Sequence, residues 1–205
     1  MARKTKAEAE KTRQQLIDAA RKVFFSRGVS RTSLEEVANV AGVSRGALYW
    51  HFANKTDLLF ATRDEATLPV IDHVDAKLID PTLADPLDGI RQALMLILLD
   101  LDENRAVREM LQVVLFRCEY VDDFAAVLAR ISESWRSFSG KLEGAYERAA
   151  TKGLLRAGVV PHLAAQDTMA FVVGFLQCWL AEPANPGFRA ELPALIDHHL
   201  ALRRA

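Results

Sequence analysis

The sequence predicts an all-α protein of about nine helices, with a small N-terminal head and a larger C-terminal helical domain. Apolar residues recur every three or four positions through almost all of the 205 residues, which is the spacing of one helix face. No segment shows sustained two-residue alternation, so no strand is expected. With 10 Gly, 7 Pro and 50% hydrophobic residues, the composition also argues against a disordered or turn-rich chain.

The first predicted helix runs from Glu8 to about Arg27, with its apolar residues on one stripe. Gly28 is expected to end it, because glycine readily takes the left-handed backbone found at helix C-termini. Thr32 and Ser33 then offer hydroxyl groups as N-caps, and a glutamate follows each of them three residues later, as in a capping box. This doubled signal predicts a second helix that begins near residue 33.

The second helix is expected to end by Gly42, which can adopt the backbone of a tight turn. Ser44 can cap a third, short helix from Arg45 to about Phe52, and Asn54 can cap a fourth. One long helix, two short helices and the start of a fourth helix are therefore predicted within the first 60 residues.

The fourth helix is predicted to run from Lys55 toward Ile79, with Pro69 inside it. Proline has no N–H to donate to the carbonyl of Glu65, and its ring clashes with that carbonyl, so we expect a kink or a break. Pro86 is expected in the first turn of a fifth helix. Four more helices are predicted at about residues 104–118, 122–152, 163–181 and 189–203.

Residues 33–52 have the pattern of a helix-turn-helix unit, two short helices joined by a tight glycine turn. Ala38 and Gly42 lie four residues apart, where we expect the helices to approach too closely for a large side chain. A small core between these two helices and the first one is predicted from Leu34, Val37, Val43 and Leu48.

A helix-turn-helix unit binds DNA by placing its second helix in the major groove, with the N-terminal residues toward the base edges. Arg45 is placed to reach a guanine or a phosphate. The hydroxyl groups of Thr32, Ser33 and Ser44 can contact phosphate oxygens, and Lys55 adds a positively charged phosphate contact.

The formal net charge of −1 hides an asymmetry along the chain. Residues 1–57 hold 11 Lys and Arg against 6 Asp and Glu, a net charge of +5. Residues 58–205 hold 15 against 21, a net charge of −6. A basic head on an acidic body suggests a local contact with a polyanion, although a solvated Lys-rich helix would give the same count.

Several classes of protein are disfavoured by what the sequence contains. Cys118 and Cys178 are too few for a disulfide framework or a four-thiolate zinc site, so a reducing, cytoplasmic compartment is expected. Apolar stretches fall well short of the roughly 20 residues of a membrane span, and the polar N-terminus carries no secretory signal. The five histidines lie at no recognisable spacing from other titratable groups, so no catalytic site, cofactor or metal is expected.

The segment TSLEEVANVAGVSRGALYWHFANKTDL resembles the DNA-binding segment of TetR-type transcriptional repressors. The opening MARKTKAEAEKTRQQLIDAA and the later LFRCEYVDDF are similar to the AcrR/TtgR branch, which represses multidrug efflux-pump genes. The resemblance implies a homodimer on a palindromic operator. It also implies a DNA-binding domain over residues 1–54 and a ligand-binding and dimerisation domain over residues 55–205.

The resemblance also implies roles for residues of the third helix. Gly46 and Ala47 would let this helix lie close to the groove. Tyr49 and His51 are expected to fix the position on the DNA backbone rather than to read bases. For Trp50, packing against the first or fourth helix is as well supported as a DNA contact. By their positions in the matching segment, the resemblance implies DNA contacts by Arg45, Tyr49, Trp50, His51 and Lys55.

Residues 80–205 hold more large apolar side chains than a simple dimerisation stalk needs. Each could be ordinary core, but the resemblance implies an apolar drug pocket between these helices. Trp135 and Phe138 are the leading candidates for stacking on an aromatic ligand, with Glu65, Arg117 and Glu119 as weaker candidates for polar contacts. The expected apolar ligand contacts are Ile90, Ala93, Ile97, Leu111, Val114, Trp135, Phe138, Leu142, Met169, Val172 and Leu176.

The last two helices are more apolar than packing on one domain requires, which predicts a two-fold interface built as a four-helix bundle. Because the fourth helix joins the two halves, a tilt about Pro69 would change the spacing of the recognition helices when an apolar inducer binds. The expected interface residues are Phe171, Phe175, Cys178, Trp179, Leu195, Ile196, His199 and Leu200.

Three alternatives remain at this point. A TetR-type regulator of lipid or small-metabolite genes is the main one, because the head does not encode the ligand. A redox sensor acting through Cys118 or Cys178 is weaker, since both thiols fall in apolar helical surroundings. An enzyme is the weakest, because none of the motifs of a catalytic site is present.

Overall fold

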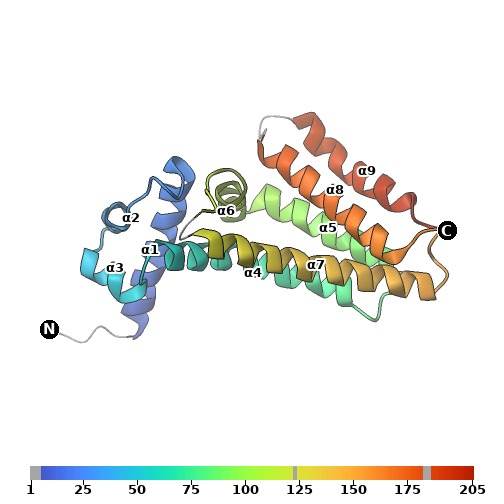
Figure 1. The fold of residues 1–205 in the computed structure, drawn as a ribbon, viewed down its shortest axis with the longest axis horizontal. Coiled ribbons are helices and arrows are strands. Elements are labelled where there is room, and N and C mark those ends of the chain that lie inside the picture. The colour runs from blue at the N-terminus through green and yellow to red at the C-terminus, as the bar shows by residue number, and fades with distance from the viewer. Residues whose placement is uncertain (1–5, 122–123, 182–185) are drawn as a thin grey trace. The chain divides into compact units, whose positions relative to one another are not determined.

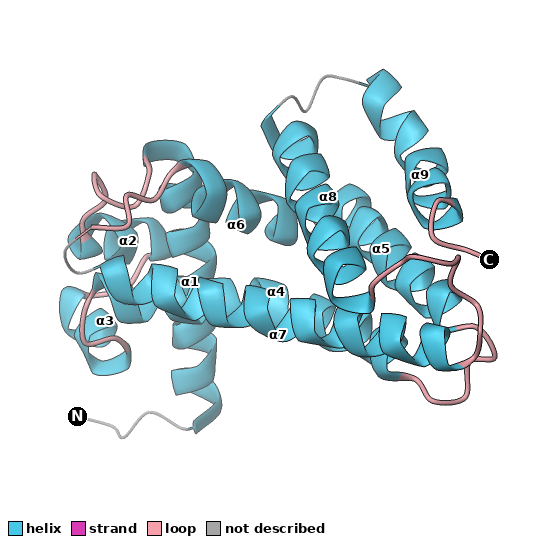
Figure 2. Cartoon of the chain, turned by 45° about the vertical axis from the view of Figure 1, so that its right-hand side comes forward, coloured by secondary structure: helices cyan, strands magenta, loops and turns pink. Residues whose placement is uncertain are grey.

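A computed structural model of the chain describes residues 6–121, 124–181 and 186–205. The predicted all-α class is confirmed, since these ranges contain no strand, and the expected number of helices is also found (Figures 1 and 2). The described residues form nine helices: α1 (Lys6–Arg27), α2 (Leu34–Ala41), α3 (Arg45–His51), α4 (Lys55–Ile79), α5 (Pro86–Glu103), α6 (Arg105–Phe116), α7 (Ala125–Thr151), α8 (Pro161–Ala181) and α9 (Pro186–Ala201).

The chain divides into two compact units, and the long helices α4 and α7 contribute to both. The first unit, called the head here, comprises Met1–Leu68 and Arg105–Ala129. The second, called the body, comprises Pro69–Asn104 and Arg130–Ala205. The head therefore includes α6 in addition to the predicted helix-turn-helix, and the boundary inside α4 falls at Pro69.

The core of the head forms where α1 packs against α2, α3 and α6. Leu16, Phe24, Val37 and Leu48 are buried, in agreement with the helix stripes predicted from the sequence. On α6 the carboxylate of Glu109 is also buried, and it pairs with guanidinium groups from α1 and from the start of its own helix. This ion pair fastens α6 to the helix that supports the DNA-binding motif.

The predicted caps are found at three of the four positions. The Ser33 hydroxyl accepts from Glu36 N at 3.1 Å, and the Ser44 hydroxyl accepts from Ala47 N at 3.2 Å. At the start of α4, Asn54 Oδ1 accepts from Asp57 N at 2.8 Å. Each of these bonds satisfies a backbone donor that the first turn of a helix leaves free.

Two expectations about the residues that flank α2 are wrong. Thr32 is not an N-cap: it is buried, and its hydroxyl donates to the carbonyl oxygen of Gly28 at 2.8 Å. Gly42 is not at a close approach of two helices, since a Cβ there would meet no atom within 4 Å. Glycine is needed at this position only because of the backbone conformation, since φ is +68° at the end of α2.

Pro69 does not break α4, which continues as one helix from Lys55 to Ile79. Helices tolerate an interior proline when neighbouring packing compensates for the lost hydrogen bond. Of the two expected outcomes, a kink or a break, the break is therefore wrong, and the kink stays a prediction. Pro69 marks the place where the helix passes from the head to the body.

The body is assembled around α5, α8 and α9, which lie together in both views (Figures 1 and 2). Helix α9 packs against α5 and α8, and residues such as Ile90, Leu94 and Ile196 are fully buried. The later part of α7 is attached to α4 by an ion pair between Lys141 and Asp75. The body thus has a closed apolar core of its own.

The helix boundaries of the body are close to those predicted. Asp85 is the N-cap of α5 and accepts from Leu87 N at 2.8 Å, with Pro86 at the first helical position as expected. The predicted start of a helix at residue 122 lies outside the described residues, as do residues 182–185 between α8 and α9. Pro193 lies inside α9, within the helix predicted at about residues 189–203.

Helix α8 is long and apolar enough to cross a membrane by length and composition alone. The same test is met by the core helix of a folded protein, and several α8 residues, including Thr168, Val172 and Phe175, are buried in the body. The helix therefore has a packing explanation.

Candidate nucleic-acid interface

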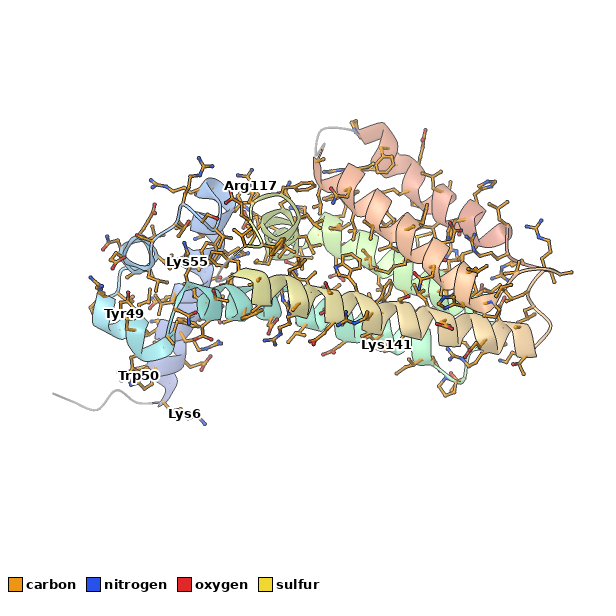
Figure 3. All side chains as sticks on the ribbon, in the orientation of Figure 1. Lys6, Tyr49, Trp50, Lys55, Arg117 and Lys141 are labelled. Atoms are coloured by element: carbon orange, nitrogen blue, oxygen red, sulfur yellow. The ribbon has the colours of Figure 1, made fainter. Side chains whose placement is uncertain are left out.

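The surface of α3 presents an arginine and two aromatic side chains to solvent. Tyr49 is 44% exposed and Trp50 is 73% exposed (Figure 3). The guanidinium of Arg45, one helical turn before Tyr49, lies 5.4 Å from the centre of the Tyr49 ring. Large aromatic side chains are rarely left this exposed without a partner, so this surface fits contact with another molecule.

The sequence left open whether Trp50 packs inside the protein or faces outward, and in the structure it faces outward. Its exposure excludes packing against α1 or α4, and its nearest ring is that of His51, with centroids 4.5 Å apart in an edge-to-face arrangement. The residue that α3 does bury is Leu48, which anchors the helix in the core of the head. A DNA contact by Trp50 remains a prediction.

The small and hydroxyl-bearing residues expected at the DNA take two different positions. Ser33, Ser44 and Gly46 are exposed, and a Cβ at Gly46 would meet nothing within 4 Å, so nothing in the head obstructs a close approach there. Ala47 is half-buried. Thr32 is buried with its hydroxyl bonded inside the turn, so the expectation that this hydroxyl reaches a phosphate is wrong for this structure.

Lys55 is held by the turn between α1 and α2. Its ammonium donates to the carbonyl oxygens of Ser30 at 3.1 Å and Thr32 at 2.9 Å, and it lies 5.4 Å from the centre of the Phe124 ring. The expected phosphate contact by Lys55 stays a prediction, but the structure gives this side chain a definite role within the head. No local pattern indicated that role, because the partners are backbone carbonyls 23 and 25 residues away.

The segment that follows α6 also contacts the turn between α1 and α2. The N–H of Val29 donates to the carbonyl oxygen of Arg117 at 3.0 Å, and the Arg117 guanidinium lies 4.9 Å from the centre of the Phe25 ring (Figure 3). Glu65 accepts a hydrogen bond from Gln14. Arg117, Glu65 and the exposed Glu119 all belong to the head, where the structure gives Arg117 and Glu65 partners in α1.

Two glutamates of α2 form ion pairs that were not anticipated. Glu35 Oε1 lies 3.1 Å from Arg45 Nη2, and Glu36 Oε1 lies 2.9 Å from Arg27 Nε. The sequence indicated these glutamates only as helix-capping residues. The signal that could have revealed the Glu35 pair is the 10-residue spacing to Arg45, which a helix-turn-helix brings together across its turn.

The residues expected around a ligand are divided between the head and the body. Leu111 and Val114 lie on α6 in the head, and the others belong to the body. In the body the rings of Trp135 and Phe138 are half-buried. Ile97 and Met169 are half-buried as well, whereas the buried members are Ile90, Ala93, Leu142, Val172 and Leu176.

The predicted dimer residues differ in exposure within the single chain, and their place at a dimer interface stays a prediction. Within the body α9 packs against both α8 and α5, and most of the expected side chains are buried. Cys178 and Leu195 are exposed, and Phe171 is half-buried against the His199 ring. The buried ones are Phe175, Trp179, Ile196, His199 and Leu200.

His199 belongs instead to a buried polar chain inside the body. Its Nε2 is hydrogen bonded to the Thr168 hydroxyl at 2.9 Å, and that hydroxyl is bonded to the Tyr146 hydroxyl at 2.7 Å. The ring stacks on Phe171 with centroids 4.3 Å apart. Burial lowers the pKa of His199, so the ring is held neutral.

The thiols offer little support for redox sensing. Burial, with a smaller contribution from the charge of Glu119, raises the pKa of Cys118 to about 11, so its reactive thiolate form is suppressed. Cys178 is exposed on α8. No group of three or more potential metal ligands occurs within the described residues.

These features define a helix-turn-helix protein: a short, capped recognition helix is held in the core of the head, with basic and aromatic side chains on its free face. Residues 16–62 match the family described as "Bacterial regulatory proteins, tetR family", and residues 85–204 match the "MAATS-type transcriptional repressor, C-terminal region". The chain belongs to the TetR family of DNA-binding transcriptional regulators.

Curated relatives align along most of the chain. The transcriptional regulator TtgR of Pseudomonas putida is 31% identical over 204 residues, covering 100% of this chain and 97% of that protein. The transcriptional repressor BepR of Brucella suis is 35% identical over 181 residues, covering 87% of this chain and 85% of that protein. These relatives are regulators and repressors, not enzymes.

Solved structures share the fold closely. NalD, the secondary repressor of the MexAB-OprM multidrug efflux pump in Pseudomonas aeruginosa, superposes with a TM-score of 0.84 at 27% identity and covers 97% of this chain and 98% of its own. SmeT, the repressor of the Stenotrophomonas maltophilia pump SmeDEF, has a TM-score of 0.78 at 28% identity, covering 94% and 90%. A complex of SmeT with triclosan has a TM-score of 0.83 at 29% identity, covering 95% and 92%.

Proposed function

We propose that this protein is a cytoplasmic, ligand-responsive repressor of multidrug efflux-pump genes, released from a palindromic operator by a hydrophobic small molecule. The observation that carries the DNA-binding part is the free face of α3, with Arg45, Tyr49 and Trp50 exposed on a helix fixed by its cap and by Leu48. Relatives named as efflux repressors support the choice of regulated genes.

The DNA contacts fall into two groups by chemistry. Arg45 is the residue that reads a base, because a guanidinium can donate two hydrogen bonds to guanine. The backbone contacts, which fix register without reading sequence, come from Tyr49, Trp50, His51, Ser33 and Ser44. In this proposal Lys55 supports the turn that carries these groups and reaches a phosphate only as a secondary role.

The dimer would use the face of α8 and α9 that the body leaves exposed, not the buried residues first expected. Repressors of palindromic sites are two-fold dimers, and a two-fold interface must be complementary to itself. Exposed apolar side chains remain on these helices and their flanks, where they are free to pack against another helix. They are Leu163, Val173 and Cys178 from α8, and Leu195 and Leu202 from α9 and its end.

Charge substitutions on this face test the dimer. Val173→Arg and Leu195→Arg should each shift the protein from dimer to monomer in light scattering and weaken operator binding, because a buried unpaired charge is costly. Ile79→Arg, at the exposed end of α4, is the matched control and should leave the mass unchanged. A wild-type chain that is monomeric at micromolar concentration would contradict the proposal.

The ligand would contact the body, where Trp135 and Phe138 keep part of each ring accessible. Triclosan is the first probe to use, because SmeT binds it and shares this fold. Trp135→Ala and Phe138→Ala should each weaken release by triclosan without weakening operator binding in its absence. Unchanged release in both variants would place the ligand elsewhere.

Coupling between the two functions would act through α4 at Pro69, where the helix passes from head to body. A dimer occupies successive major grooves with recognition helices about 34–36 Å apart, so a change in α4 alters the fit. A hundredfold release requires about 2.7 kcal/mol of differential ligand binding. If Pro69→Ala changes neither operator affinity nor release, Pro69 is not the hinge.

A mobility-shift titration on DNA upstream of the protein's own gene and its neighbours, with and without triclosan, tests operator and inducer together. The proposal predicts a sequence-specific shift at or below micromolar dimer that the ligand reverses. Release by a fatty acyl compound, with no response to hydrophobic drugs, would instead make the protein a regulator of lipid genes.

A further inference from the structure

The Arg45 side chain contacts two neighbouring side chains, those of Glu35 and Tyr49. Its Nη2 lies 3.1 Å from Glu35 Oε1 on α2, and its guanidinium lies 5.4 Å from the centre of the Tyr49 ring. The start of α3 is itself fixed, since the Ser44 hydroxyl accepts from Ala47 N. The side chain that would read a base is therefore positioned by a carboxylate of the preceding helix.

The ion pair is easily opened. The Arg45 side chain is 67% exposed and that of Glu35 is 46% exposed, and exposed pairs of this kind contribute little to stability. DNA can consequently take Arg45 from Glu35 when it offers a better partner. A guanine, whose O6 and N7 accept two hydrogen bonds from one guanidinium, is such a partner.

We infer that Glu35 determines specificity in the DNA interface, by keeping Arg45 neutralised until a correctly placed guanine replaces the carboxylate. On unrelated DNA the Glu35–Arg45 pair persists, and Arg45 adds nothing to the sequence-independent attraction for phosphates. On the operator the pair opens and Arg45 binds the base. This inference rests on the proposed DNA-binding face of α3, and it gives Glu35 a role that acts through another residue.

Glu35→Gln tests this role while preserving the size of the side chain. The substitution frees the positive charge of Arg45. For random DNA, the slope of log K against log salt concentration should become steeper by about 1, and the affinity should rise about five- to tenfold at about 0.1 M salt. Operator affinity should change less, since the pair is already open there. The ratio of specific to non-specific affinity should therefore fall.

Glu36→Gln is the matched control, because Glu36 lies next in the sequence, carries the same charge and pairs with Arg27 at 2.9 Å. It changes the net charge of the head equally but does not touch Arg45, so the specificity ratio should be retained. Circular dichroism and thermal melts of both variants establish that the head remains folded. Equal effects of the two substitutions on random DNA and on the ratio would overturn the inference.

A double-mutant cycle separates action through Arg45 from direct repulsion between Glu35 and phosphates. In an Arg45→Ala background, Glu35→Gln should no longer tighten binding to random DNA. If the full effect persists there, Glu35 acts directly and the inference is wrong. Failure of the proposed function itself would look different, because the wild-type protein would then show no preference for any upstream DNA over random DNA.

Discussion

The Lys55 ammonium donates to the carbonyl oxygen of Thr32 at 2.9 Å, and this bond joins the start of α4 to the turn that leads into the DNA-binding motif. The same ammonium bonds to Ser30 O and faces the Phe124 ring. The turn also receives the Val29–Arg117 backbone hydrogen bond. The position of α2 and α3 thus depends on contacts made by the first residue of α4 and by the segment that follows α6.

Lys55→Met should lower the free energy of unfolding by about 1 kcal/mol, because two carbonyl oxygens lose a charged donor. Urea unfolding checks the stability, and fluorescence anisotropy at several salt concentrations checks the binding. If Lys55 acts mainly as a support, operator affinity falls while the salt slope stays the same. A slope smaller by about 1 would instead assign Lys55 to a phosphate.

Gly42 and Gly46 should respond oppositely to alanine. Gly42 has φ of +68°, so Gly42→Ala should destabilise the protein by about 1–2 kcal/mol although there is space for the methyl group. Gly46 lies within α3 with open space around it, so Gly46→Ala should stabilise the fold by about 0.5–1 kcal/mol. Urea unfolding of the two variants measures both changes.

Operator binding by the Gly46→Ala protein distinguishes stability from function. If the groove approaches this position closely, the variant melts at a higher temperature than the wild type but binds DNA less tightly. Unchanged affinity would show that Gly46 and the DNA backbone are not in close contact.

Gly89 is a packing requirement of the body that no sequence pattern indicated. A Cβ there would lie 2.7 Å from the carbonyl oxygen of Lys77, so α5 and the end of α4 would have to separate. Gly89→Ala should cost about 1–3 kcal/mol in urea unfolding, as overpacking does. Gly140→Ala on α7, where the added methyl meets nothing within 4 Å, is the control and should not destabilise.

The protein should be less stable in mild acid than at neutral pH, because His199 is buried. Burial lowers its pKa below the ordinary value of 6.5, so the unfolded chain binds a proton that the folded chain does not. The free energy of unfolding should therefore fall as the pH drops below about 6.5, and level off below the pKa of the folded state. His199→Gln should flatten this dependence, measured by urea unfolding at fixed protein concentration from about pH 5 to about pH 7.5.

Identical profiles for the wild type and His199→Gln would contradict the assignment of the buried chain from Tyr146 through Thr168 to His199 as the source of the effect.

The helices and their caps could be predicted from local sequence, because periodicity, Ser33, Ser44 and Asn54 act within a few residues of the boundaries they set. Pro69 was judged by the hydrogen bond it removes, but α4 continues through it as one helix, so the loss of one hydrogen bond did not decide the course of the chain there. Local patterns therefore defined the elements but not every interruption.

The interaction surfaces were harder to predict than the helices. An apolar residue on a terminal helix can face either its own domain or a second copy, and composition does not distinguish the two; Trp179 and Ile196, expected at the dimer interface, are buried within the single chain. The contacts of Lys55 and Glu35 depend on chain segments brought together only by the fold. The exposure of Arg45, by contrast, follows from its place in the motif.

In the proposed function one chain couples operator binding to a hydrophobic ligand, and coupling between two sites is reciprocal. Calorimetric titration of triclosan into the free protein and into its operator complex measures this coupling from the ligand side. We expect the affinity for the free protein to be higher, by the same factor by which saturating triclosan weakens operator binding. Equal triclosan affinities for the free and operator-bound protein would show that the two sites are not coupled.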